Sequence, residues 1–308
     1  MSSSSRDSDS LVLAVPPRFH FWRTVFSHGW CSLPPFSYDP GSHTLSRVFS
    51  VAGNRSVFAL LRAGNRSVIV KPADPHLLTP AMKKELATQA RTCLRLDDDI
   101  TEFYRTAARI PQYRWIVAAG AGRLLRAPSV FEDAVKTICT TNCTWELTTL
   151  MVHNLVDALG HIDTLGKHRS FPSPESIAGA TEMFMRSEIK SGYRSPFLVE
   201  FAERVAAGTL DVEAWRHSPL STEDLVTAMR DVKGIGPYAA GNLLKLVGRY
   251  DELALDSWVR SKYYELHHRG RKVKDATIEQ AYAPYGKWRG LLFWLEMTRG
   301  QLSTALNS

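Results

Sequence analysis

A glycine-rich turn between two helix-forming segments is the first feature of this sequence that could bind a ligand. The turn reads Lys233-Gly234-Ile235-Gly236, and Pro237 follows it at a position suited to the start of a helix, where its missing N–H is not needed. Free N–H groups at such a helix start attract phosphate, and glycine allows close approach to the backbone. Lys233, Gly234 and Gly236 are therefore candidate phosphate contacts. An ordinary helical hairpin with a glycine turn has the same pattern.

An aspartate follows this turn at a characteristic distance. Asp256 lies eighteen residues after Tyr238, within the segment LALDSWVR at 253–260. Together with the segment KGIGPYAAGNLL at 233–244, it resembles the hairpin and the catalytic aspartate of the helix-hairpin-helix DNA glycosylase superfamily. Asp256 also fits the N-cap of a helix that begins with Ser257 and Trp258. Both roles can hold at once.

Three further segments extend the resemblance in the same order along the chain. The segment 128–145 is similar to the one that supplies a void-filling side chain in 8-oxoguanine glycosylases and AlkA-type alkylbase glycosylases. Residues 192–194 resemble the wedge loop of the oxoguanine branch, and 282–294 resemble the closing helix of the fold. The resemblance covers about 128–299, and more weakly the N-terminal sheet, and it indicates the AlkA/8-oxoguanine-glycosylase-like branch without an iron–sulfur cluster.

The resemblance implies a chemistry for the candidate aspartate. Breaking the bond between a deoxyribose and its base builds positive charge on the sugar. A carboxylate beneath the sugar stabilises that charge and can take a proton from the attacking water. Asp256 is the candidate for both tasks. Bifunctional members of the superfamily carry a nucleophilic lysine where this chain has Tyr238, and a tyrosine cannot form a Schiff base. We therefore expect a monofunctional enzyme without lyase activity; by position, neither Lys233 nor Lys245 replaces the missing lysine.

Enzymes that act on a base turn it out of the duplex, and protein groups fill the gap. By resemblance, Asn142 fills the void and Tyr193 is the wedge. Arg194 would contact the opposite-strand base or a phosphate, and Arg260 a phosphate. The alternatives are a helix cap for Asn142, a loop aromatic covering the core for Tyr193, and plain surface charges for the two arginines.

The damaged base is the least determined part of the prediction. Gly290 stands where oxoguanine glycosylases carry a base-reading glutamine, and Trp294 where they carry a stacking phenylalanine. Tyr238, Trp258 and Trp294 together predict an aromatic base pocket suited to a cationic alkylated purine such as 3-methyladenine. Gly290, also assigned to the pocket, would leave room for a bulky modified base. The alternatives are an oxidised purine, a bulky modified base of foreign DNA, or a helix-hairpin-helix protein that binds damage without cutting. Aromatic residues are also ordinary core material.

No cofactor is expected to be required. All four cysteines precede Thr144, so the iron–sulfur cluster of the endonuclease III type is expected to be absent. By resemblance, the backbone carbonyls of Arg230, Val232 and Ile235 could hold a structural Na⁺ or K⁺.

The elements that must position these residues predict an α+β fold. Apolar runs at 44–51, 57–61 and 68–70, separated by two Gly-Asn turns, indicate an antiparallel meander. Helical periodicity follows. Predicted helices span 79–94, 97–108, 129–139, 145–159, 195–207, 222–232, 237–247, 256–266, 275–282 and 287–299. We divide the chain into a disordered tail (1–15), a TBP-like sheet domain with helices (16–110) and a helical catalytic body (111–308) with its hairpin at 224–248.

Composition agrees with a DNA-binding protein. The 308 residues include 38 Lys and Arg against 31 Asp and Glu, which gives a formal charge of +7. A basic surface speeds the capture of a polyanion such as double-stranded DNA. No apolar run approaches the roughly 20 residues that a membrane helix needs, and the N-terminus lacks the pattern of a signal peptide. We expect a monomer inside the cell, in the nucleoid-containing cytoplasm of a bacterium or the nucleus of a eukaryote.

Overall fold

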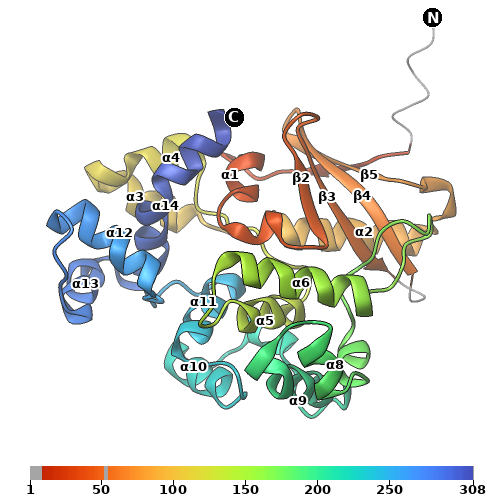
Figure 1. Cartoon of the computed structure of the whole chain (residues 1–308). Helices are drawn as coiled ribbons and strands as arrows, with labels where there is room; N and C mark the ends of the chain where they lie inside the picture. Colours follow the sequence, from red (N-terminus) through yellow and green to blue (C-terminus); the bar gives the residue numbers. More distant parts are fainter. Residues whose placement is uncertain (1–8, 52–54, 308) are drawn as a thin grey trace, which may run out of the picture.

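A twisted antiparallel sheet forms one side of the molecule, and helices form the rest (Figure 1). The computed structural model describes residues 9–51 and 55–307. The strand order is β1-β5-β4-β3-β2, and every neighbouring pair is antiparallel. The strands are β1 (Leu11–Ala14), β2 (Phe36–Asp39), β3 (Thr44–Val51), β4 (Arg55–Gly64) and β5 (Ser67–Pro72).

The predicted meander corresponds to β3, β4 and β5. Its second turn is a two-residue turn of Asn65 and Arg66, because Gly64 still pairs with Ser67 at the end of the ladder. Arg66 takes the left-handed conformation, with φ 51°. The prediction that Gly64 itself forms the turn was wrong by one residue. The first predicted Gly-Asn turn, at 53–54, lies outside the described residues.

The prediction that residues 1–15 form a disordered tail was wrong for residues 11–14. Leu11–Ala14 forms strand β1, which pairs with β5 from Leu11 opposite Val70 to Ala14 opposite Ser67. The apolar residues that begin at position 11 therefore complete the sheet edge. Residues 1–8 lie outside the described part of the chain.

Helices joined by loops and turns follow the sheet along the rest of the described chain. The predicted bounds agree with those of α2, α5, α6, α11 and α13 to within one residue, because caps, prolines and glycines mark their ends locally. Thr79, Ser129 and Thr144 each accept a hydrogen bond from the backbone three residues later. The helices are α1 (Phe21–Val25), α2 (Pro80–Leu94), α3 (Thr101–Arg109), α4 (Arg114–Ala119), α5 (Val130–Cys139), α6 (Trp145–Leu159), α7 (Pro174–Ala178), α8 (Glu182–Ser187), α9 (Ser195–Ala206), α10 (Thr222–Arg230), α11 (Pro237–Val247), α12 (Ser257–His268), α13 (Asp275–Tyr282) and α14 (Arg289–Asn307).

Short 3₁₀ helices connect several of these elements. They span Gly29–Ser32, Pro75–Leu77, Pro111–Tyr113, Gly192–Arg194, Glu213–His217 and Ala283–Trp288. None of the helices in the described residues is long and apolar enough to cross a membrane.

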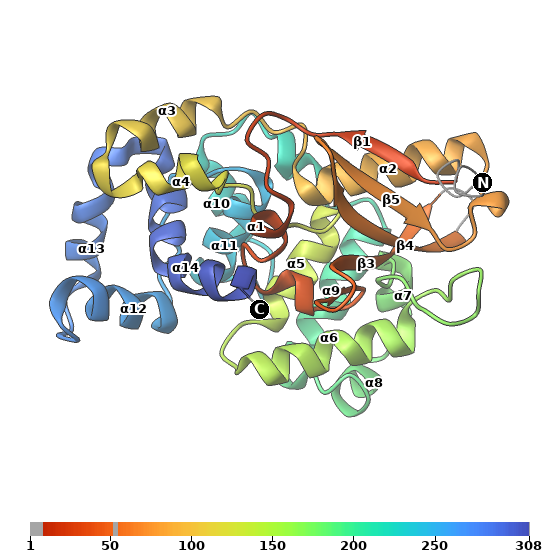
Figure 2. The same ribbon diagram turned by 90° about the horizontal axis from the view of Figure 1, so that it is seen from above.

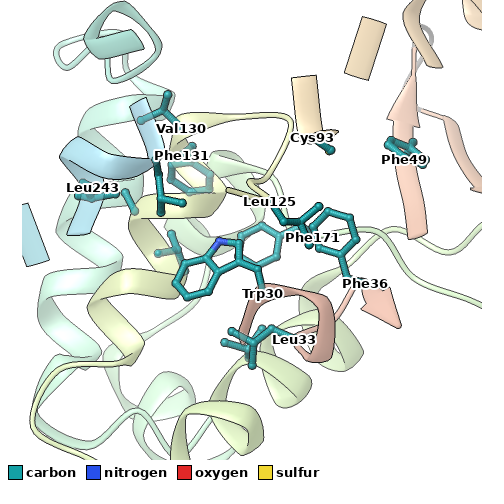
Figure 3. Close-up of a cluster of buried hydrophobic side chains, with 14 of the residues drawn as sticks. Trp30, Leu33, Phe36, Phe49, Cys93, Leu125, Val130, Phe131, Phe171 and Leu243 are labelled. Atoms are coloured by element: carbon teal, nitrogen blue, oxygen red, sulfur yellow. The ribbon is translucent and has the colours of Figure 1, made fainter. Parts of the chain in front are cut away.

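One hydrophobic core joins the sheet to the central helices. Figure 3 shows Phe49 of β3 at one end of this cluster, Leu243 of α11 toward the other, and Trp30 between them. The Trp30 indole N–H donates to the Asp133 carboxylate of α5 at 2.8 Å, so the buried polar group is satisfied. The sheet and the central helices are thus continuous in the interior.

A second core contradicts the predicted boundary at residue 110. Phe103 of α3 and Ile116 of α4 pack with Leu291 and Leu295 of α14. Figure 2 shows α3 and α4 beside α13 and α14, at the far end of the molecule from the sheet. Helix α3, which we predicted to belong to the sheet domain, therefore packs with the C-terminal helices. Long-range packing decides this, and local sequence carries little signal of it.

Candidate active site

A cleft of about 1340 Å³ lies where the α10–α11 hairpin meets the start of α12. Its walls also include the α5–α6 loop, the 3₁₀ turn before α9 and Trp294 of α14. Among the residues that line it, Asp256 carries the single carboxylate. The basic lining residues are Arg194, Arg230, Lys233, Lys245 and Arg260. Such a lining favours a negatively charged ligand.

The hairpin presents an open helix N-terminus to this cleft. Gly234 has φ +91°, a backbone conformation that residues with a side chain rarely adopt. A Cβ at this position would lie 3.0 Å from the Phe197 Cβ. Gly236 is the N-cap of α11, makes no side-chain cap, and has no atom within 4 Å of an added Cβ. The first N–H groups of α11 therefore stand where an anion can reach them. Lys233 is exposed and forms an ion pair with Glu200 at 2.8 Å.

Asp256 both caps α12 and lines the cleft. One carboxylate oxygen accepts the Val259 N–H at 2.7 Å. The side chain is half-buried and shares the cavity with Gly236 and Tyr238. A carboxylate oxygen has lone pairs to spare after one such bond. The two roles predicted for Asp256 are thus compatible in this geometry.

Two glycines allow the segment before Asp256 to pack closely. A Cβ at Gly241 of α11 would lie 2.8 Å from the Ala254 Cβ, and Ala254 itself has φ 52°. A Cβ at Gly290 of α14 would overlap the Glu252 carbonyl, and the Gly290 N–H donates to the Tyr250 carbonyl at 2.6 Å. The prediction that Gly290 lines the base pocket was wrong. It is a packing glycine, because α14 contacts the backbone of this segment there.

The three predicted pocket aromatics do line the cleft. Trp258 and Trp294 lie 6.2 Å apart between ring centroids and are tilted by 52°. The Trp294 indole N–H donates to the Ser27 carbonyl at 3.0 Å, which fixes the ring. Burial raises the pKa of Tyr238, and the nearby Asp256 carboxylate adds to that rise. Tyr238 is therefore an uncharged phenol at neutral pH.

Lys245 is a cleft residue that we missed as a site residue. It follows Tyr238 and Asn242 on one face of α11, at helical spacings of seven and three residues, and all three line the cleft. The side chain is 4% exposed, and its Nζ lies 4.5 Å from the Trp294 ring centroid. Burial lowers the pKa of Lys245 to about 8, although Asp256 opposes this shift. The available signal was a lysine within the apolar run LLKLV.

His28 is another cleft residue that sequence reasoning did not select. Its Nε2 is hydrogen-bonded to the Leu125 carbonyl, and burial lowers its pKa to about 3. The ring is therefore neutral, donates through Nε2 and keeps Nδ1 as an acceptor.

Two predicted duplex-opening residues meet at one edge of the cleft. Asn142 is exposed, has φ 46°, and its amide donates to the Tyr193 hydroxyl at 3.2 Å. Tyr193 is 48% exposed. Thr144 is the residue that caps α6, which excludes the capping alternative for Asn142. Tyr193 does not cover the core either. Both side chains are exposed and line the cleft.

The two arginines predicted to contact DNA already have protein partners. Arg194 is 4% exposed, and its guanidinium donates to the carbonyl and the hydroxyl of Thr141. It supports the loop that carries Asn142 and also lines the cleft, so its predicted contact with DNA stays a prediction. Arg260 forms a two-point ion pair with Asp275, at 2.8 and 2.7 Å. This pair competes with any phosphate contact.

The four cysteines form no disulfide bond. Cys31, Cys93 and Cys139 are buried, and Cys143 is partly buried. Within the part of the chain that the structure describes, no three His, Cys, Asp or Glu side chains come together as a metal site.

Sequence comparison finds a relative with a glycosylase name. No protein family model matches the chain. The Bacillus subtilis (strain 168) protein named "Putative DNA-3-methyladenine glycosylase YfjP" is 22% identical over 130 residues. The match covers 40% of this chain and 44% of that protein, so it spans less than half of this relative.

Solved structures match over nearly the whole chain. MBOgg1 in complex with a low-affinity DNA ligand has a TM-score of 0.74, 18% identity, and coverage of 95% of this chain and 97% of its own. The 3-methyladenine DNA-glycosylase from Archaeoglobus fulgidus has a TM-score of 0.73, 18% identity, and coverage of 94% and 98%. The apo 8-oxoguanine glycosylase/lyase of Clostridium acetobutylicum has a TM-score of 0.73, 18% identity, and coverage of 94% and 96%. These matches confirm the predicted α+β fold.

Proposed function

We propose that this chain, whose fold is that of the helix-hairpin-helix DNA glycosylases, is itself a DNA glycosylase that removes a damaged base from duplex DNA. The observation that carries the proposal is the arrangement of the cleft. The Asp256 carboxylate and the uncapped N-terminus of α11 line the same cavity, and Asp256 is the single acid among its lining residues. A phosphate held at the helix start would bring the adjoining deoxyribose toward the carboxylate.

The reaction follows from these positions. The N–H groups after Gly236 hold a backbone phosphate of the damaged strand. Asp256 stabilises the positive charge that develops on the sugar as the C1′–N bond breaks, and accepts a proton from the attacking water. Its bond to Val259 N–H keeps the carboxylate oriented. The products are a free base and an abasic site in intact DNA.

We infer that the enzyme is monofunctional. The position that would carry an attacking amine, directly after the hairpin, holds the phenol of Tyr238. Lys245 lies two turns further along α11, and its Nζ is directed at Trp294. The nucleophile in this proposal is therefore water.

Base extrusion would depend on the edge formed by Asn142 and Tyr193. Both are exposed, and a hydrogen bond joins them. Asn142 would occupy the gap left by the extruded base, and Tyr193 would wedge between neighbouring pairs. Arg194 would hold this edge in place through its hydrogen bonds to Thr141.

The base removed has two candidates. A cationic alkylated purine such as 3-methyladenine is supported by the aromatic lining of Trp258 and Trp294, and by the names of the Bacillus subtilis relative and the Archaeoglobus fulgidus structure. A neutral purine lesion, for example an oxidised one, is favoured by the amine of Lys245 in the pocket wall.

A monovalent cation would strengthen the phosphate site. Arg230 ends α10, and Val232 and Ile235 follow it in the hairpin turn. The Val232 carbonyl accepts the Ile235 N–H at 3.0 Å and keeps a second lone pair. Carbonyl oxygens are suitable ligands for Na⁺ or K⁺. Such an ion would add positive charge beside the bound phosphate.

One assay tests the proposed reaction. Duplexes that each carry a single modified base are incubated with the protein and then treated with alkali, which cleaves DNA at abasic sites. We expect strand cleavage only after alkali, and its loss with Asp256→Asn. Base release that is undiminished in this variant would rule out the proposed role of Asp256. Damage-dependent binding without any base release would identify a non-catalytic binding protein.

A further inference from the structure

A buried amine without a hydrogen-bond partner faces the cleft. Lys245 Nζ is inaccessible to solvent and has no hydrogen-bond partner among the residues that the structure describes. Leaving such a group unpaired costs free energy, so its retention in a cleft wall indicates a ligand that completes it. The residue lies on α11 one turn after Gly241, on the side that packs against the segment before Asp256.

Three side chains around Lys245 determine which interactions its amine can make. Trp294 of α14 presents its ring face to Nζ at 4.5 Å. Asp256, at the start of α12, acts on it electrostatically but forms no ion pair with it. His28, from the segment before the first 3₁₀ helix, is neutral. The amine is therefore a hydrogen-bond donor in the cleft wall that has no partner among the described residues.

We propose that Lys245 donates a hydrogen bond, and in the transition state a proton, to the base that leaves, and that the substrate is therefore a neutral purine lesion. The proposal rests on the proposed glycosylase function and assigns its substrate class. The geometry that carries it is the unpaired Nζ in the wall that also holds Asp256, Trp258 and Trp294.

The step balances without a further reactant. The C1′–N bond breaks and its electron pair goes to the base nitrogen. The base takes a proton from the Lys245 ammonium at a ring nitrogen or an exocyclic oxygen. Water adds its oxygen to C1′ and gives a proton to Asp256. Transfer of that proton through solvent restores the charged lysine and the carboxylate, so the net reaction consumes one water.

A cationic base would gain nothing from this arrangement. A purine alkylated at a ring nitrogen already leaves as a neutral molecule, so it needs no proton. Its positive charge would lie beside the lysine ammonium in a site of low polarity, where like charges repel strongly. The Trp294 face that would bind it by cation–π contact is already covered by Lys245 Nζ.

The test measures single-turnover base release from two kinds of duplex. One kind carries a neutral lesion (hypoxanthine, 1,N6-ethenoadenine or 8-oxoguanine), and the other carries cationic 7-methylguanine. The variants are Lys245→Met, Lys245→Gln and, as a matched loss of one positive charge, the exposed Lys84→Met on α2. The two substitutions at 245 guard against one of them failing to fold, which thermal unfolding monitors.

We expect the wild type to release a neutral lesion. Both Lys245 variants should lose this activity by about 10²-fold or more, the usual scale of general acid catalysis. Their release of 7-methylguanine should stay unchanged or rise, and Lys84→Met should match the wild type on both substrates. A merely structural lysine would change both rates together.

Several outcomes would overturn the proposal. Equal slowing of both substrates would make Lys245 structural, and wild-type release of 7-methylguanine alone would refute the substrate class. A borohydride-trapped adduct that disappears in Lys245→Met would make the residue a nucleophile. In the first two cases Asp256-dependent base release persists, so the proposed function stands. The trapped adduct would leave base removal intact but would contradict the monofunctional mechanism, because water would no longer be the nucleophile. Failure of every substrate with wild-type protein refutes the proposed function itself.

Discussion

Gly241 of α11 packs directly against Ala254, two residues before Asp256. A Cβ at position 241 would lie 2.8 Å from the Ala254 Cβ and 3.1 Å from its Cα. The contact links the helix that begins at the proposed phosphate-binding turn to the segment that carries the Asp256 carboxylate. The distance between phosphate and carboxylate therefore depends on a glycine that touches neither ligand.

Gly241→Val should consequently impair catalysis more than DNA binding. The added side chain must displace the segment 253–256, and overpacking of this kind costs roughly 1–3 kcal/mol of stability. A shift of about 1 Å at the carboxylate can lower the rate about 10²-fold. Single-turnover rates and duplex affinity are the measurements. The control is Gly300→Ala in α14, where nothing lies within 4 Å of an added Cβ. A normal rate in Gly241→Val would refute the positioning role.

Substitutions of Asp256 should separate its two roles. Asn is as good an N-cap as Asp, so Asp256→Asn should keep the bond to Val259 N–H and nearly the whole stability. Its base release should fall by about 10²-fold or more, because the negative charge is lost. Asp256→Ala should lose a similar amount of activity and in addition about 1 kcal/mol of stability. Equal stability of the two variants in urea unfolding would show that the cap contributes nothing.

Lys245→Met should make the protein more stable at neutral pH. Burial lowers the folded-state pKa of this lysine from 10.5 to about 8. The unfolded chain then binds the proton more tightly, so the folded state carries the full cost below about pH 8, and the cost fades as the pH rises toward 10.5. Removing the amine should add up to about 3 kcal/mol at pH 7, and much less near pH 10. Denaturant unfolding at both pH values is the measurement. A variant that is less stable at pH 7 would contradict it.

Substitution of Arg194 should lower the stability of the protein, whereas substitution of Tyr193 should lower its activity. Arg194→Met removes the buried guanidinium that donates to Thr141, so we expect a loss of about 2–3 kcal/mol of stability. Tyr193→Ala removes a side chain that is 48% exposed, so stability should stay nearly unchanged while base release falls. Thermal unfolding and excision rates are measured together. Full activity of Tyr193→Ala would remove this residue from the proposed wedge.

Asp275→Asn should strengthen the binding of duplex DNA. Asp275 holds the Arg260 guanidinium in a two-point ion pair, and its neutralisation would release that charge beside the cleft. We expect higher affinity for duplex DNA. The slope of log K against log salt concentration should become more negative by about 0.9, the contribution of one additional phosphate contact. Fluorescence anisotropy across a salt series measures both. If Arg260 lies away from the DNA, the salt slope of Asp275→Asn will equal that of the wild type.

Local sequence was sufficient to predict most helices and strands. It also predicted that the glycine turn and Asp256 lie close together. Thr144 and Gly160 mark the ends of α6, and Pro237 marks the start of α11, because caps and proline act on neighbouring backbone. The eighteen-residue spacing from Tyr238 to Asp256 correctly predicted one shared cleft. These features depend on contacts within a few turns of chain.

Other features were decided by residues far apart in the sequence. Gly290 is a packing residue because α14 contacts the Glu252 carbonyl there. Arg194 stabilises a loop because its guanidinium donates to Thr141. Lys245 lies in the cleft wall because two distant parts of the chain pack against one face of α11. These are the segment before Asp256, and Trp294 of α14. The sequence alone determined most of the helices, the glycine turn before α11 and the position of the candidate acid. Tertiary structure decided which side chains the cleft leaves without partners, since burial and pairing arise only when distant segments pack together.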